Sequence, residues 1–169
     1  MPKPTPGTYP PYFDNYIRLT DFDTPTEGIN KYSAYLNQFF SGLPIEKVDY
    51  RYAAGKWNLK EMLLHMIDTE RIFAYRALAL SRGETTPLPG FDENEYANKS
   101  AAEGRTWQSL LEEFKAVRFS TDLLLLSFTA DQLTRTGTTN NNPTSVNAIV
   151  YTIFGHLLHH VNIVNERYL

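Results

Sequence analysis

Apolar residues recur at spacings of three and four over four long segments of this chain, and this periodicity restricts its fold more than any other feature. In the first segment, for example, Ile29, Tyr32, Leu36 and Phe39 follow one another at these spacings. Such spacing places an apolar stripe along one face of an α-helix, whereas no stretch of the chain gives a convincing β-strand. We therefore expect an all-α protein, a four-helix bundle. The expected helices span residues 24–43, 58–81, 106–128 and 145–169.

Capping signals mark the start of the first two expected helices. Thr24 is followed by a proline and, three residues on, by Glu27, a combination that closes the first turn of a helix. Asn58 and Glu61 repeat this arrangement before the second periodic segment. These signals fix both helix starts independently of the apolar pattern.

The remaining segments connect or precede the helices. Residues 1–23 are rich in proline and tyrosine, and we expect an extended segment that packs on a single bundle domain of residues 24–169. The 20-residue loop 85–104 is long for a compact bundle, and such loops often cover a functional site. Trp57, Tyr52 and residues 87–91 are candidates for the wall of such a site. We expect a polar loop over residues 129–145.

Composition excludes several classes of function. The net charge is −3 without a block of like charges, so we expect neither a nucleic-acid partner nor binding to an anionic membrane. Cysteine is absent, which excludes disulfides, thiolate metal ligands and a cysteine nucleophile. There is no apolar run resembling a signal peptide and no stretch of ~20 apolar residues. We therefore expect a soluble, cytoplasmic protein.

Three of the four histidines lie in the stretch GHLLHHVN, residues 155–162. Because each residue advances a helix by about 100°, His156 and His160 fall within the aliphatic face of the last helix. His159 falls at the edge of that face and is expected to point sideways or outward. The remaining histidine, His65, lies at the edge of the apolar stripe of the second helix, among Thr69, Arg76 and two apolar residues.

Two interpretations of these histidines remain open from the residues alone. A single core histidine is usually a hydrogen-bonded part of the core. Three inward histidines on two helices are harder to explain in this way, because aliphatic walls offer neither donors nor acceptors to the rings. The alternative is a metal site in which His65 joins His156 and His160, which stand one turn apart.

Three charged residues near this site have other candidate roles. Asp68, one turn from His65, is a weak candidate for a general base, and a surface charge or a partner that orients His65 is at least as good an interpretation. Glu70 and Arg118 both fall within apolar stripes, and we predict that they pair inside the bundle, because either charge alone would be costly to bury. An alternative role for Arg118 is contact with an anionic substrate.

The blocks GKWNLKEMLLHMIDTERIFAYRALALSRGETTPLPGF (55–91) and GHLLHHVNIVNERYL (155–169) resemble the DinB-like superfamily, in its YfiT-type branch. The resemblance extends over nearly the whole chain. It implies a four-helix bundle and one divalent metal ion, often nickel or zinc, held by His65, His156 and His160. Characterised relatives include transferases that join low-molecular-weight thiols to electrophiles, and members of this branch are named hydrolases largely by analogy.

This resemblance leads to two hypotheses about function. The first is a metal-dependent enzyme, a hydrolase or a low-molecular-weight-thiol S-transferase, acting on a small-molecule substrate. The second is a bundle without catalytic activity, in which the metal is structural or serves as a sensor. A closed site with four protein ligands would favour the second, and a site open to a pocket would favour the first. Family members often dimerise through helix faces, which makes a homodimer plausible.

Overall fold

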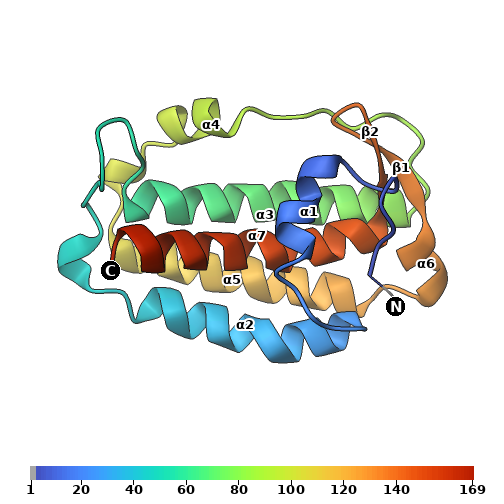
Figure 1. Cartoon of the computed structure of the whole chain (residues 1–169), viewed down its shortest axis with the longest axis horizontal. Coiled ribbons are helices and arrows are strands. Elements are labelled where there is room, and N and C mark those ends of the chain that lie inside the picture. The colour runs from blue at the N-terminus through green and yellow to red at the C-terminus, as the bar shows by residue number, and fades with distance from the viewer. Residues whose placement is uncertain (1–2) are drawn as a thin grey trace.

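Four long α-helices lie side by side and form the body of the protein, as expected (Figure 1). The computed structural model describes residues 3–169. All four helices begin after a capping side chain: Thr24, Asn58, Thr106 and Ser145 each accept a hydrogen bond from a backbone N–H of the first turn. The long helices are α2 (Pro25–Ser41), α3 (Leu59–Ser81), α5 (Trp107–Leu126) and α7 (Val146–Arg167).

The apolar stripes of the four helices form one hydrophobic core. Helix α3 packs against both α5 and α7, and α2 packs on the same two helices. Burial of such side chains contributes about 1.5–3 kcal/mol each, so the core dominates the stability of the bundle. Its most deeply buried large side chains include Leu36, Phe40, Leu63, Ile67, Phe114, Tyr151 and Phe154.

The N-terminal segment packs on the bundle, but the expectation that it is extended throughout is wrong. Residues 11–17 form a short 3-10 turn, Pro11–Phe13, followed by one turn of α-helix, α1 (Asp14–Ile17). Phe13 and Ile17 are buried, and they anchor α1 across α7 (Figure 1). The element is too short to show a helical period in the sequence. Residues 1–2 of this segment lie outside the described residues.

A glycine on α7 allows this close approach. A Cβ added to Gly155 would lie 2.2 Å from the backbone oxygen of Tyr16, far inside a contact distance. Because backbone cannot be displaced as easily as the end of a flexible side chain, no larger residue fits without moving α1. Gly155 immediately precedes His156, so α1 is held directly over that histidine.

The polar loop expected over residues 129–145 is ordered and contains the one sheet of the described residues, which we had not predicted. After the short helix α6 (Ala130–Thr134), strands β1 (Thr136–Thr139) and β2 (Asn142–Ser145) pair antiparallel. Asn140 and Asn141 join them with φ of 48° and 60°. Positive φ at both central residues is the signature of a type I′ hairpin turn, which asparagine tolerates well.

The long loop after α3 is also partly structured. It contains the short helix α4 (Glu93–Lys99) and a 3-10 turn, Ala102–Gly104. Leu88 bonds through its backbone to Thr138 and Asn140 of the hairpin, with N···O distances of 2.9 Å. These bonds fasten the loop to the hairpin at the C-terminal end of α3 (Figure 1).

Glu70 and Arg118 pair inside the bundle, as predicted. Arg118 Nη1 lies 2.9 Å from Glu70 Oε2, and both side chains are almost completely buried. This contact is an ion pair without hydrogen-bond alignment. The Nε and Nη2 atoms of Arg118 donate to Asp122 Oδ1 at 3.2 and 2.8 Å, and Ser33 donates to the same oxygen. We call Glu70, Arg118 and Asp122 the charge cluster. Its burial excludes contact between Arg118 and a substrate.

Among residues 3–169, no helix combines the length and the apolar character that a membrane span requires.

Candidate metal centre

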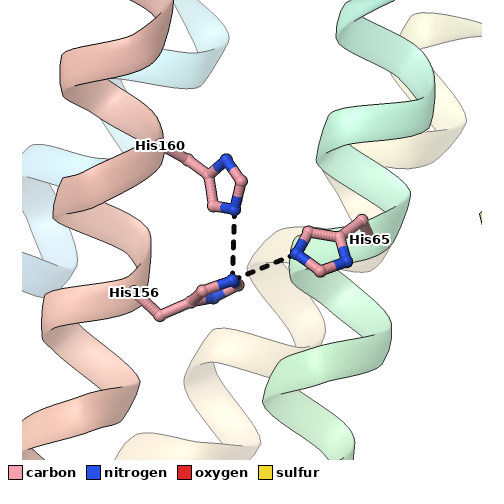
Figure 2. Close-up of side chains that lie close together, drawn as sticks. All are labelled: His65, His156 and His160. Atoms are coloured by element: carbon pink, nitrogen blue, oxygen red, sulfur yellow. Dashed lines mark hydrogen bonds between the residues drawn. The ribbon is translucent and has the colours of Figure 1, made fainter. Parts of the chain in front are cut away.

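The side chains of His65, His156 and His160 converge between helices α3 and α7 (Figure 2). The Nε2 atom of His156 lies 3.1 Å from that of His65 and 3.1 Å from that of His160. We call these three residues the histidine cluster. Its members are the histidines that the helical wheels placed on facing sides of the two helices.

The burial of the histidines follows their positions on the helices. His156 and His160 are 5% and 6% exposed, and His65 is partly buried. His159 lies outside the cluster: it is half-buried and its ring meets that of Tyr16 at 5.5 Å. The described residues therefore offer three ligand atoms and no fourth histidine or carboxylate within the same group.

The three nitrogens are not a self-sufficient hydrogen-bonded group. An imidazole nitrogen carries either one N–H or one lone pair in the ring plane. His156 Nε2 has two nitrogen neighbours at 3.1 Å, so in every tautomer it must share its single donor or acceptor between them. Moreover, His160 Nδ1 is buried without a hydrogen-bond partner among residues 3–169. The arrangement lacks the satisfied partners of an ordinary core histidine.

The spacing of the nitrogens suits a metal ion. A divalent ion such as zinc lies about 2.0–2.1 Å from each imidazole nitrogen, which separates adjacent ligand nitrogens by about 2.9–3.4 Å. Two of the three observed separations, each 3.1 Å, fall in this range, and all three ligand atoms lie within 4.8 Å of one another. The residues present therefore fit a divalent metal ion bound through three Nε2 atoms.

Burial keeps the rings neutral, which is the form that binds metal. It lowers the pKa of His65 to about 4, with a smaller contribution from the nearby His159. Burial also lowers the pKa values of His156 and His160 well below their usual range, and the neighbouring histidines add to the effect. At neutral pH all three rings keep a lone pair for an ion.

The environment of His65 orients its ring. Thr69, one turn further along α3, places its hydroxyl 3.4 Å from His65 Nδ1. The indole of Trp57 lies beside the imidazole, with ring centroids 4.8 Å apart. These two contacts direct the opposite nitrogen, Nε2, toward His156.

The cluster forms one end of a cavity of about 470 Å³. Of the predicted wall residues, Trp57 and Phe91 line it, whereas residues 87–90 are not part of its wall. Tyr52 lines a separate, smaller hollow beside Trp57 and His160 instead. The other wall residues come from the N-terminal segment, α3, α4, the hairpin turn and α7: Tyr12, Tyr16, Thr69, Phe73, Arg76, Glu93, Asn140 and His159.

Asp68, the weak candidate for a general base, is outside this arrangement. Its side chain is 31% exposed and its carboxylate faces Arg71 at 3.9 Å. It is not part of the cavity wall. Burial raises the pKa of its carboxyl, with Arg71 opposing the shift. The position agrees with the alternative interpretation of a surface charge.

The fold matches that of a solved structure over almost its whole length. YfiT from Bacillus subtilis, described as a probable metal-dependent hydrolase with an unusual four-helix bundle topology, superposes with a TM-score of 0.72. The match covers 97% of this chain and 90% of YfiT at 17% sequence identity, so it is a likeness of fold.

Sequence comparison identifies the family directly. No curated protein matches the chain. The family model of the DinB superfamily matches residues 32–164, a segment that includes all three members of the histidine cluster and most of the bundle. This agrees with the resemblance of the blocks 55–91 and 155–169. The chain belongs to the DinB superfamily.

Proposed function

We propose that this protein is a metal-dependent enzyme in which His65, His156 and His160 hold one divalent ion, with zinc or nickel as the candidates. The observation that carries the proposal is the convergence of three Nε2 atoms at one end of a 470 Å³ cavity. A cavity of this volume accommodates a small molecule rather than a polymer. We further propose that the enzyme acts as a low-molecular-weight-thiol S-transferase or a hydrolase.

The chain's own residues have distinct tasks in this proposal. His65, His156 and His160 would bind the ion with neutral rings, and Thr69 would keep the His65 ring in its orientation. Tyr16 and Trp57 would wall the site and restrict the approach of water. A divalent ion, when bound, supplies a Lewis acid that favours the deprotonated form of a thiol or water in its open positions.

Thiol transfer is the better supported of the two reactions. Hydrolytic metal sites commonly add a carboxylate base beside the metal ligands. Here Asp68 faces Arg71 and is not part of the cavity wall, and Glu93 lines the cavity from the exposed start of α4. Neither carboxylate belongs to the group of ligand atoms formed by the three histidines. A free thiol has a pKa of about 8.5, so it needs little help to ionise beside a cation. The absence of cysteine from the chain requires that such a thiol come from a cosubstrate.

The cavity favours an enzyme over a purely structural metal site. Structural zinc sites are typically closed by four protein ligands. The described residues supply three ligand atoms, and the cavity adjoins them on the remaining side. His159, the nearest candidate for a fourth ligand, packs on Tyr16.

Metal content tests the proposal. Elemental analysis of protein purified without an affinity tag should find about one equivalent of metal in the parent chain. His65→Ala and His160→Ala should lose it. His159→Ala is the matched control, because it removes a histidine from the same helix that lies outside the cluster, and it should retain the metal.

Two outcomes would contradict the proposal. One is a folded parent protein that contains no metal and takes up neither zinc nor nickel. The other is equal loss of metal in His159→Ala and in the cluster variants. A positive result should be followed by a screen of thiols against electrophiles with the metal-loaded protein.

A further inference from the structure

Arg76 places a buried positive charge in the wall of the cavity. The residue is 4% exposed, and its guanidinium lies 5.8 Å from the ring centre of Phe73 and 6.0 Å from that of Phe91. Within residues 3–169, no carboxylate lies within ion-pair distance of it. This contrasts with Arg118, which is also buried and has two carboxylate neighbours. A buried cation without a counter-ion is costly and calls for a partner.

The hydrogen bond that Arg76 donates within the protein does not explain why a charged side chain is buried at this position. Nη2 donates one hydrogen bond, of 2.6 Å, to the backbone oxygen of Pro89 in the loop that follows α3. A neutral donor could make this bond without the cost of burying a cation. A guanidinium has five N–H donors arranged as a fork, so most of its capacity remains for a ligand.

The position of Arg76 gives the cavity two chemically different ends. His65, Thr69, Phe73 and Arg76 follow one face of α3, and all four line the cavity. Phe73 lies between the ends, since its ring is 6.2 Å from that of His156 and 5.8 Å from the Arg76 guanidinium. A ligand that reaches from one end to the other must therefore pass an aromatic side chain.

The charges around Arg76 select the kind of anion. One guanidinium balances a single negative charge, and its fork matches the two oxygens of a carboxylate. Glu93 also lines the cavity and would repel a second negative charge. Tyr12 and Asn140 add a hydroxyl and an amide to the same wall. These features favour a monocarboxylate over a phosphate dianion.

We propose that Arg76 binds the carboxylate of the substrate, so that the enzyme acts on small molecules with a carboxylate at one end and the reacting group at the other. The identity of the reacting end rests on the proposed function. The carboxylate site itself does not, because Arg76 has no contact with the histidine cluster.

The first experiment compares two thiols that differ in one group. Isothermal titration of the zinc-loaded protein should show that 4-mercaptobutyrate binds at least about tenfold more tightly than 4-mercaptobutan-1-ol, since a charge-assisted pair replaces a neutral contact. Arg76→Met should abolish this preference, and Arg76→Lys should keep part of it. Arg82→Met, the matched control, removes an exposed arginine just beyond the same helix and should leave the preference intact.

The second experiment uses the metal-free protein and so separates the two proposals. The Arg76 Nε–H signal in a ¹⁵N spectrum can be assigned by its loss in Arg76→Lys. Butyrate should shift this signal and butyramide should not. This measurement needs neither bound metal nor a folded Arg76→Met variant.

Each outcome either supports or overturns the carboxylate site at Arg76. Loss of the preference in Arg76→Met with unchanged zinc content supports the carboxylate site. A parent protein with no preference, or an Arg76→Met protein that keeps it, overturns the site. If the parent takes up no zinc, the proposed function fails, and the butyrate shift alone decides about Arg76. Tighter binding of propylphosphonate than of butyrate overturns the assignment to a monocarboxylate.

Discussion

The charge cluster and the histidine cluster are both buried and polar, and both use helix α3, yet they are built on opposite principles. In the charge cluster, a guanidinium lies between two carboxylates, so charges of opposite sign adjoin one another. In the histidine cluster, three neutral imidazole rings point their Nε2 atoms toward one another. In the first, each charged group has a neighbour of opposite charge within the protein. The second adjoins a cavity.

This difference separates a structural role from a functional one. Both Glu70 and His65 are inward polar residues on one helix, so inward position alone does not identify a site. Complementarity of charge is the difference: groups of opposite charge that pair within the protein stabilise the fold, whereas convergent groups of one kind favour a ligand. Arg76 differs from Arg118 in the same respect, because no carboxylate among residues 3–169 lies within ion-pair distance of it.

The largest expected effect is on the charge cluster. Arg118→Met should reduce the free energy of unfolding by about 3–5 kcal/mol, because it leaves the buried Glu70 without its cation. Urea denaturation followed by circular dichroism measures this. The double variant Glu70→Gln/Arg118→Met should lose less than the sum of the two single variants, with a coupling of about 0.5–3 kcal/mol. Strict additivity would show that the pair does not act as a unit.

In contrast to the charge cluster, substitution of a histidine in the histidine cluster should not lower the free energy of unfolding of the metal-free protein. Without metal, His156→Leu should unfold at the same denaturant concentration as the parent or a higher one, since the variant removes a nitrogen without a complementary partner. Zinc at 100 times its Kd should stabilise the parent by about 2.7 kcal/mol and leave His156→Leu unchanged. Both values follow from urea denaturation with and without zinc. A large loss of stability in the metal-free variant would place the histidines in the structural class.

The smallest effect is expected next to the cluster. Asp68→Asn should change the free energy of unfolding by no more than about 0.5 kcal/mol, because its partly exposed carboxylate lies 3.9 Å from Arg71 and makes no closer ion pair within residues 3–169. Its metal content should equal that of the parent. Loss of metal in this variant would mean that Asp68 helps to orient His65, and Asp68 would then belong to the metal site.

The sequence predicted those parts that depend on one helix at a time. Helix starts at Thr24 and Asn58 follow from local capping, and the inward positions of the histidines and of Glu70 and Arg118 follow from the helical period. Asp122, which completes the charge cluster, lies one turn beyond Arg118 and was recoverable from that spacing.

The parts that the sequence did not reveal depend on how loops fold over the bundle. The hairpin turn uses two asparagines instead of the more recognisable Asn-Gly, and its strands do not alternate apolar and polar residues. Tyr12, Tyr16 and Asn140 reach the cavity only through tertiary contacts. Arg76 could have been found, because it lies 11 residues after His65 and so within about 20° of it on the helix.

The docking of α1 on α7 has a consequence for how the site comes into being during synthesis. The histidine cluster joins residues 91 positions apart in sequence, and the segment that covers it packs on α7, the last of the four long helices in chain order. A nascent chain that has reached only α5 therefore carries His65 and the N-terminal tyrosines but no coordination geometry. The histidine cluster can therefore assemble only after α7 has been synthesised, and until then the apolar face of α3 lacks one of the helices that cover it.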